Sequence, residues 1–374
     1  MVSFLYRVLA TAFAALFRLM APGRQRSGEE LRILCLTGGG MGDMADTLAL
    51  FNALRRHFPR AHLTVACDRS GESVARASDV VNDVIVLKPS SSSWLAALKN
   101  AGRLQNYDWA LAAKDGFDRR LALMVRLSNA TVRVGFEHPH RPLSAYFTDP
   151  LPLPQGEEHR TDTLLRLLKP LGMVRPTSMS VDLNLNVPNA AKAFATAVLS
   201  KPPFSESKHY LLINLTRTPG LKFREEDFIA LIGRLLNSTQ FVVALVAEPA
   251  DQPLAFEVAA VMASDRITAV ETPEMLDLAA LLEHATCLVT PEGDIAHLAA
   301  AINIPALVLW HGDHFQRRHA RARRLAFVRA EAGEANIPLE RVWQALLPFL
   351  GSHREGIDQK MTDLLDLPPL SDFT

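Results

Sequence analysis

The chain has 374 residues, and its 40 Lys and Arg balance its 40 Asp and Glu, so that the formal net charge is zero. Two domains, each with its own core, are expected at this length rather than one. Hydrophobic residues make up 48% of the chain, a content that excludes a mainly disordered protein. The charge balance argues against a surface built throughout for nucleic acid, although local basic patches remain compatible with it.

The three cysteines, Cys35, Cys67 and Cys287, each lie in an apolar run that predicts a buried strand. Three are too few for a disulfide scaffold or a cysteine metal site. No cluster of His, Cys and Asp has the spacing of metal ligands. We therefore predict reduced core thiols in a cytosolic protein and no metal centre.

The first 30 residues are hydrophobic, but Arg7 and Arg18 leave only residues 8–17 uncharged between them. A membrane-spanning helix needs about 20 apolar residues. Small and polar residues recur at spacings of three and four, which predicts an amphipathic helix. Three interpretations stay open for this helix. It lies in the interface of an anionic membrane, it packs on the rest of the protein, or it is a signal peptide with a poor cleavage site.

Strands and helices alternate from residue 31 onward. The expected strands of the first half lie at 31–37, 62–67, 84–87, 109–113 and 131–135. One helix is expected from the end of the loop 38–43 to about His57, and another at 161–171. Strand, helix and strand repeated with short connections predict a parallel, doubly wound sheet. A proline-containing region at 188–207 interrupts this pattern and is interpreted as a linker.

A second αβ series follows the linker. Its expected strands lie at 210–215, 241–246, 287–290 and 306–310, and its expected helices at 225–236, 254–263, 275–284 and 295–302. We predict an α/β chain with an N-terminal helix at 1–30, Rossmann-like domains at 31–187 and 208–350, and a tail at 351–374. In such an architecture a ligand is expected in the cleft between the two domains.

A glycine-rich loop, Gly38-Gly39-Gly40-Met41-Gly42, joins the first strand to its helix, where free backbone N–H groups favour an anion. The loop fails the pattern G-x-G-x-x-G, because Asp43 stands where the third glycine is required. It therefore favours an NAD(P)-dependent oxidoreductase only weakly. Asp43 lies in the first turn of the helix, where the dipole stabilises a carboxylate. It is either a helix cap or a base that accepts the proton of an attacking hydroxyl.

Several short motifs follow one another along the chain. In the first half they are Gly42-Asp43, Arg133-Val-Gly135 with Arg141 in the following loop, and His159 before a helix; in the second half they are Ile213-Asn214, Lys222 and the stretch 278–310. Together they resemble the ADP-heptose:lipopolysaccharide heptosyltransferases of glycosyltransferase family 9. The resemblance covers residues 31 to 347 in scattered blocks, and the stretch 278–310 is the most specific of them.

The resemblance implies a GT-B architecture, in which two Rossmann-like doubly wound domains face an interdomain cleft. It implies an inverting, metal-independent glycosyltransferase without a cofactor, which moves a sugar from a nucleotide-sugar donor to a lipopolysaccharide-core or related glycan. ADP-heptose is the family's default donor, and a phosphorylated glycolipid or oligosaccharide is the expected acceptor. Such an enzyme is expected in the bacterial cytoplasm, with peripheral contact at the inner face of the cytoplasmic membrane and no nucleic-acid partner.

Carried over position by position, Asp43 matches the family's proposed general base. The donor-binding residues implied by the resemblance are Asn214, Thr216, Lys222, Glu292, Gly293, Asp294 and His297. The phosphate or acceptor loop consists of Gly39, Gly40, Met41 and Gly42, and the grouped basic residues Lys114, Arg120 and Arg141 are the expected acceptor patch. The physical basis on the donor side is a loop-to-helix junction that offers N–H donors to a diphosphate, with Lys222 adding a point charge.

Two departures from the family pattern leave the donor open. Glu292 stands where the family usually has Asp, and Gly293 and Asp294 replace small or hydroxyl residues. A carboxylate beside a diphosphate is repulsive unless it points away or a cation intervenes. The turn after Trp310 also departs, because it reads His311-Gly-Asp-His314. A GT-B-like protein that binds ligands without transferring a sugar is therefore the alternative.

The basic run at 317–324 contains five arginines. It is either a solvated helical face or a surface for a phosphorylated glycolipid or an anionic membrane.

Overall fold

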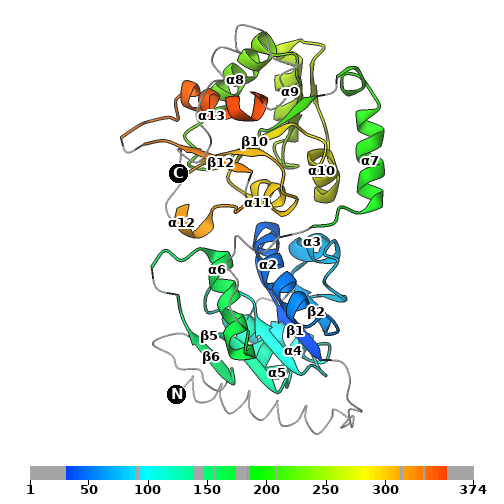
Figure 1. The fold of residues 1–374 in the computed structure, drawn as a ribbon, viewed down its shortest axis with the longest axis vertical. Coiled ribbons are helices and arrows are strands. Elements are labelled where there is room, and N and C mark those ends of the chain that lie inside the picture. The colour runs from blue at the N-terminus through cyan, green and yellow to red at the C-terminus, as the bar shows by residue number, and fades with distance from the viewer. Residues whose placement is uncertain are drawn as a thin grey trace. The chain divides into compact units, whose positions relative to one another are not determined.

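The structure is a computed structural model that describes residues 31–89, 92–137, 146–154, 156–173, 183, 185–207, 209–311, 315–322, 324–331 and 333–351. The predictions made for residues 1–30, for Arg141 and for most of the tail lie outside these residues. The chain divides into two compact units, one reaching Asn186 and including Gln316–Arg318, and one formed by the rest from Val187 onward. Each unit is built from a parallel sheet with helices (Figure 1).

The first unit contains six parallel strands in the order β3-β2-β1-β4-β5-β6. The strands are β1 (Arg32–Leu36), β2 (His62–Cys67), β3 (Asp83–Val86), β4 (Trp109–Ala112), β5 (Val132–Glu137) and β6 (Asp149–Pro152). The helices are α2 (Met41–His57), α3 (Glu72–Arg76), α4 (Ser93–Ala101), α5 (Arg119–Leu127) and α6 (Arg160–Leu165).

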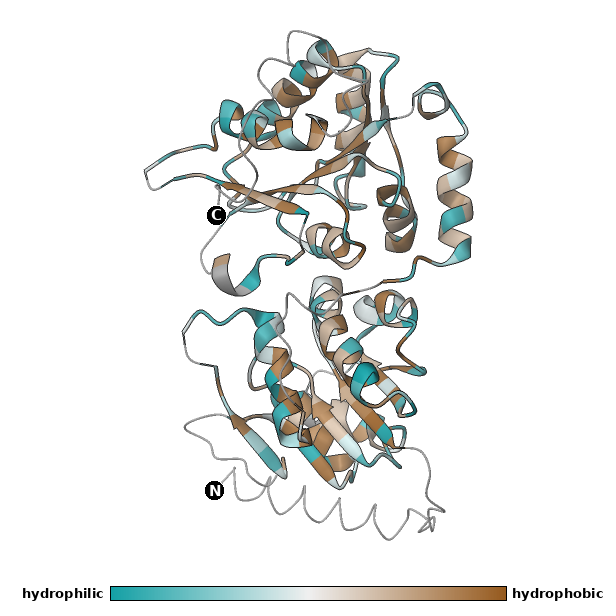
Figure 2. Cartoon of the chain, viewed as in Figure 1, coloured by the Kyte–Doolittle hydropathy of each residue, from teal (hydrophilic) through white to brown (hydrophobic). Residues whose placement is uncertain are grey.

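Both faces of this sheet are buried. Successive side chains of a strand point to opposite faces, and Leu34 and Leu36 of β1 join the apolar cluster formed with α4 and α5. Ile33 and Cys35 point the other way and are equally buried. Helix α2 packs against α6, and α4 packs against α5. Apolar side chains on both faces explain why the inner strands are apolar runs rather than alternating ones, as the hydrophobic colour of the sheet shows (Figure 2).

The second unit repeats the plan with the strand order β12-β11-β10-β7-β8-β9. Its strands are β7 (Tyr210–Asn214), β8 (Val242–Val246), β9 (Ile267–Ala269), β10 (Cys287–Pro291), β11 (Ala306–Trp310) and β12 (Leu325–Arg329). Its helices are α7 (Asn189–Leu199), α8 (Glu225–Ser238), α9 (Gln252–Met262), α10 (Met275–Leu282), α11 (Asp294–Ala301), α12 (Phe315–Arg318) and α13 (Leu339–Gly351). An apolar core joins the sheet to helices α8, α9 and α13.

Both sheets have the strand order 3-2-1-4-5-6 of the Rossmann fold. In each sheet the strand order reverses once, because the chain returns from the edge to the middle of the sheet after its third strand. The fourth strand then lies beside the first, β4 beside β1 in the first unit and β10 beside β7 in the second. Ligands of open α/β sheets bind beyond the carboxyl ends of the strands at such a switch point. The topology therefore predicts one ligand position in each unit, at its switch point.

The region 188–207 differs from the expected linker. It contains helix α7, which packs against α10, so that the second unit begins at Val187. The strands β6, β9 and β12 have no counterpart among the predicted ones, because they are edge strands that are short and only partly buried. β6 contains two prolines, which an edge strand tolerates because one side of its ladder is unpaired.

The three cysteines are free and buried, as the apolar runs predicted. Burial raises the pKa of each thiol, which disfavours the reactive thiolate. No helix in the described part of the chain is both long and apolar enough to cross a bilayer.

Candidate active site

The switch point of the first unit lies beyond β1 and β4, where the glycine-rich loop enters α2. Gly40 is the N-cap residue of this helix, and Met41, Gly42 and Asp43 form its first turn. Gly39 has φ +126, a conformation that other residues rarely adopt. A side chain at Gly39 would overlap the Asp43 carboxylate. The loop is therefore folded tightly over Asp43.

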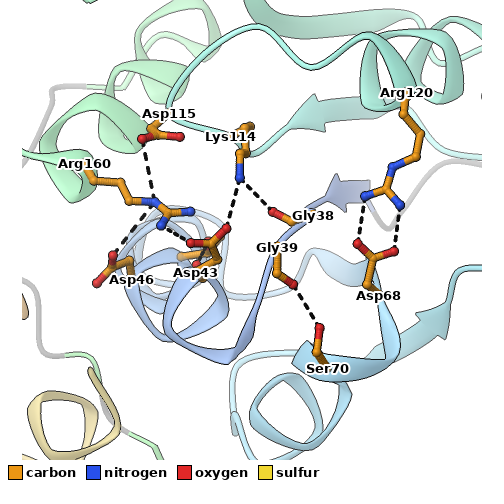
Figure 3. Close-up of polar contacts among 11 residues, drawn as sticks. Gly38, Gly39, Asp43, Asp46, Asp68, Ser70, Lys114, Asp115, Arg120 and Arg160 are labelled. Atoms are coloured by element: carbon orange, nitrogen blue, oxygen red, sulfur yellow. Dashed lines mark hydrogen bonds and ion pairs between the residues drawn. The ribbon is translucent and has the colours of Figure 1, made fainter. Parts of the chain in front are cut away.

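Both oxygens of the Asp43 carboxylate accept hydrogen bonds from cations (Figure 3). Lys114 follows β4, and its Nζ donates to Oδ2 at 3.0 Å and to the Gly38 carbonyl at 3.2 Å. Arg160 begins α6, and its Nη1 donates to Oδ1. The topology brings β4 beside β1, and the packing of α6 on α2 brings Arg160 to the same point.

The charge state of Asp43 follows from these contacts. Burial raises the pKa of its carboxyl, but the hydrogen bonds and charges of Arg160 and Lys114 outweigh burial and hold the pKa below its usual value. Burial lowers the pKa of Arg160, and its contacts with Asp43, Asp46 and Asp115 more than compensate. Asp43 is therefore an ionised carboxylate at neutral pH.

Two more carboxylates face Arg160 from behind. Its Nε lies 3.9 Å from Asp46 Oδ2 and 4.0 Å from Asp115 Oδ2. The Asp46 side chain is 4% exposed and sits one helical turn after Asp43. The sequence motifs indicate His159 but not Arg160, the residue immediately after it. Two carboxylates at positions i and i+3 of a buried helix face were the available signal, because buried charges require a partner.

A second ion pair flanks the glycine loop. Both terminal nitrogens of Arg120 bond the Asp68 carboxylate at 2.8 Å. A Cβ at Gly38 would lie 2.5 Å from Arg120 Nη2, and Ser70 Oγ donates to the Gly39 carbonyl at 3.0 Å. Two residues of the expected acceptor patch, Lys114 and Arg120, thus flank the same loop (Figure 3), and each is already paired with a carboxylate.

The switch point of the second unit lies beyond β7 and β10, and Asn214 connects the two strands. Its Nδ2 donates to Thr290 Oγ1 at 3.0 Å. Its Oδ1 accepts from the backbone N and from the Oγ1 of Thr216, at 3.0 and 2.7 Å. The amide therefore fixes the start of the loop that carries Lys222.

The chain next passes from β10 into α11. Gly293 has φ +155 at this junction, and a Cβ there would meet nothing within 4 Å. His297 Nε2 lies 3.4 Å from Glu292 Oε1, so the Glu292 side chain, one methylene longer than Asp, reaches the first turns of the helix. Glu292 Oε2 is buried and accepts no hydrogen bond from the described residues. A buried acceptor without a donor is suited to a ligand hydroxyl.

The edge of the second sheet is acidic. Glu248 follows β8, and its pKa is raised by burial and then by the charges of Asp294 and Asp251.

The structure brings the residues predicted for the donor site together only in part. Asn214 and Thr216 meet at the switch point, whereas the exposed Lys222 donates to the Glu334 carbonyl at 2.7 Å.

The loop carrying Lys222 also borders a small cavity of about 180 Å³. The cavity is lined mainly by apolar side chains, including those of Leu215, Leu221, Phe223, Phe228, Leu254 and Val258, with Thr216 among its polar lining residues. No group of three or more His, Cys, Asp or Glu residues in the described ranges is arranged to hold a metal ion.

Two parallel sheets of Rossmann order, each with polar side chains gathered at its switch point, form the architecture of the GT-B glycosyltransferases. The model of glycosyltransferase family 9 (heptosyltransferase) matches residues 95–336, and the chain belongs to this family. The resemblance and the GT-B fold predicted from the motifs are confirmed, and the chain is an enzyme, a glycosyltransferase. The family match replaces the oxidoreductase suggested weakly by the glycine loop.

The relatives are distant but match along most of the chain. Lipopolysaccharide heptosyltransferase 3 of Escherichia coli is 25% identical over 292 residues, which are 73% of this chain and 82% of that protein. A family 9 glycosyltransferase of Veillonella parvula is 16% identical, with a TM-score of 0.73 over 87% of this chain and all of that one. The E. coli heptosyltransferase WaaC, solved with ADP, is 19% identical, with a TM-score of 0.69 over 85% of this chain and all of that one. These two structures support the fold alone.

Proposed function

We propose that the protein is an inverting, metal-independent glycosyltransferase that moves a sugar, heptose by family default, from a nucleotide diphosphate to a lipopolysaccharide-core or related glycan. The observation that carries the proposal is the place and charge of Asp43. It is an ionised carboxylate at the first switch point, beside the glycine loop. A sugar hydroxyl that reaches this point finds a base within the cluster of charged side chains drawn in Figure 3.

The chemistry assigned to Asp43 is general-base catalysis. As the acceptor oxygen attacks the anomeric carbon, its proton passes to the Asp43 carboxylate and the bond to the nucleoside diphosphate breaks. Attack opposite the leaving group inverts the anomeric configuration. The leaving diphosphate carries the negative charge away, so the donor side must stabilise an anion.

The second switch point is proposed to bind the donor. The start of α11 is proposed to bind a diphosphate through backbone N–H groups and the positive end of the helix dipole, and the exposed Lys222 adds a positive charge. Glu292 Oε2 is proposed to accept a hydrogen bond from a hydroxyl group of the nucleotide-sugar donor. WaaC was solved with ADP and with ADP-2-deoxy-2-fluoro heptose, which makes ADP-heptose the first donor to test here.

The first switch point is proposed to bind the acceptor. Lys114 and Arg120 are proposed to bind its phosphate or other anionic groups. Both already pair with Asp, so an acceptor anion must compete with Asp43 or Asp68 for them. Contact of residues 1–30 with a membrane remains a prediction, as does a location at the inner face of the cytoplasmic membrane.

Calorimetric titration with ADP, UDP and GDP tests the donor site. We expect one nucleotide to bind, and Lys222→Met to weaken it about tenfold or more, because a hydrogen bond between charged groups is lost. Lys192→Met is the matched control, since Lys192 is an exposed residue of α7. No binding by any nucleotide, together with no turnover, would replace the proposal by the non-catalytic alternative.

Removing a carboxylate from the start of α11 is expected to strengthen nucleotide binding. Asp294 is the first residue of α11 and acts electrostatically on Glu248. Two like charges about 4 Å apart in water repel by about 1 kcal/mol. Asp294→Asn should therefore raise the affinity for the nucleoside diphosphate about fivefold in the same titration. An unchanged or weaker affinity would show that the diphosphate does not bind at this helix end.

A further inference from the structure

Arg160 has more carboxylates around it than the ion pair with Asp43 requires. Asp43, Asp46 and Asp115 all lie within 4.0 Å of its guanidinium. With Lys114, the cluster contains three carboxylates and two cationic side chains (Figure 3). The two cations that touch Asp43 are held very differently.

Arg160 is the fixed member. Its side chain is 13% exposed. Arg160 is the first residue of α6, a helix that packs against α2. Its Nε has no hydrogen-bond acceptor among the described residues and instead lies between Asp46 and Asp115. Moving Arg160 away would leave the buried Asp46 without this countercharge, which is strongly unfavourable.

Lys114 is the movable member. Its side chain is twice as exposed, at 27%, and lies in the connection after β4. Apart from Asp43, the described structure gives it the Gly38 carbonyl as a partner. The lysine ammonium is a point charge on a flexible side chain, so it can shift without the geometric constraint that a planar guanidinium imposes.

We propose that Arg160, held from behind by Asp46 and Asp115, is the positioning residue of the base Asp43, and that an acceptor hydroxyl approaches the Oδ2 edge, which Lys114 shares. Arg160 occupies Oδ1 and fixes the plane of the carboxylate. Oδ2 has lone pairs for both Lys114 and a hydroxyl. Once the proton arrives on Oδ2, the Asp43 carboxyl is neutral and holds the ammonium of Lys114 less strongly, whereas the Gly38 carbonyl still accepts from it. The inference rests on the proposed function in assigning the base to Asp43.

The charged groups that face Asp43 come from three elements. They are Arg160 on α6, Lys114 after β4 and Asp46 on α2 itself, with Asp115 acting through Arg160. The neighbouring charged residues of the segment 68–76 pair with other partners: Asp68 with Arg120, and Glu72 with Arg69 and Arg76. The titration of Asp43 should therefore respond mainly to Arg160 and Lys114.

NMR titration of protein labelled with 13C at the Asp side-chain carboxyl tests this without any substrate. The resonance that disappears in Asp43→Asn identifies Asp43. In Arg160→Gln its midpoint should move to higher pH by about one unit or more, because an adjacent guanidinium lowers a carboxyl pKa by about that amount. In Arg160→Lys the midpoint should return most of the way to the wild-type value, since lysine restores the positive charge but not the planar guanidinium.

Turnover of ADP-heptose with heptose-deficient lipopolysaccharide supplies the second readout. Arg160→Gln should lower kcat about 100-fold, as expected for a misplaced catalytic group, and Arg160→Lys should not restore it. Arg166→Gln is the matched control: Arg166 follows α6 directly and pairs with Glu158 at 3.3 Å. It should leave the Asp43 titration and kcat unchanged.

The outcomes separate this inference from the function on which it rests. An unchanged Asp43 midpoint in Arg160→Gln overturns the positioning role, even if Asp43→Asn is inactive. A shifted midpoint together with an active Asp43→Asn removes Asp43 as the base while leaving the contact with Arg160 intact. If Arg160→Gln does not fold, Asp115→Asn tests the same support, because Asp115 is 21% exposed and lies on Arg160. A loosened Arg160 should move the Asp43 midpoint to higher pH, and a midpoint that stays or moves lower overturns the support by Asp115.

Discussion

Replacing Asp43 with Asn is expected to lower kcat by about 10²–10⁴-fold, the range that a general base contributes. The amide has nearly the shape of the carboxylate but cannot accept the proton of the acceptor hydroxyl. Nucleotide binding should persist, because the proposed donor residues belong to the second unit, from Asn214 onward. Rates of sugar transfer from ADP-heptose and calorimetry with the nucleotide measure the two effects on one preparation.

The pH dependence of the wild-type rate provides a second check on Asp43. Because Arg160 and Lys114 hold the pKa of Asp43 below its usual value, the base stays ionised as the pH falls through the ordinary Asp range near 3.9. The acid limb of kcat is therefore expected below that range. In Lys114→Met it should move to higher pH, since one of the two cations is gone.

Asp83→Asn is the matched control for Asp43→Asn. Asp83 begins β3 and pairs with His62 at 2.7 Å, and its side chain is 63% exposed. Its loss should change turnover little, as for most exposed ion pairs. A kcat for Asp43→Asn within tenfold of wild type would contradict the assignment of the base.

The fold was predictable wherever strands are buried on both faces. Residues 210–213 and 306–310 are uninterrupted apolar runs, and they lie in β7 and β11, which are wholly buried. The edge strand β6 has the sequence DPLP, whose prolines and half-exposed side chains carry no strand signal. Helix α7 was hidden by the prolines that flank it, because prolines before and after a helix look like those of a linker.

The candidate site was predictable where a local motif carries it. Asp43 is marked by the loop that precedes it, and residues 292–297 by a strand-to-helix junction. Arg160 and Lys114 meet Asp43 across 117 and 71 positions of the chain. Such contacts depend on which strands and helices become neighbours, which no local pattern encodes. Lys222 was assigned to phosphate from its motif, and in the structure it donates to the Glu334 carbonyl.

Gly39→Ala is expected to disable the site and destabilise the first unit. The new methyl group would overlap the Asp43 carboxylate, and φ +126 is strained for any side chain. Backbone strain of this kind costs about 1–3 kcal/mol. Relief requires either a shift of the loop or a rotation of Asp43 away from Lys114 and Arg160. Turnover should therefore fall nearly as far as in Asp43→Asn, and urea denaturation should give a lower free energy of unfolding.

Gly102→Ala is the control that separates this overlap from the general effect of replacing a glycine. Gly102 caps α4 with φ −65, and a Cβ there would meet nothing within 4 Å. Alanine fits both the space and the backbone, so stability should change by no more than about 0.5 kcal/mol and turnover should stay the same. If Gly39→Ala behaved like Gly102→Ala, the loop would not be folded over Asp43 in solution. The carboxylate would then be free to leave its two cations, and its lowered pKa, the position of Oδ2 and the role of Arg160 would all lose their basis.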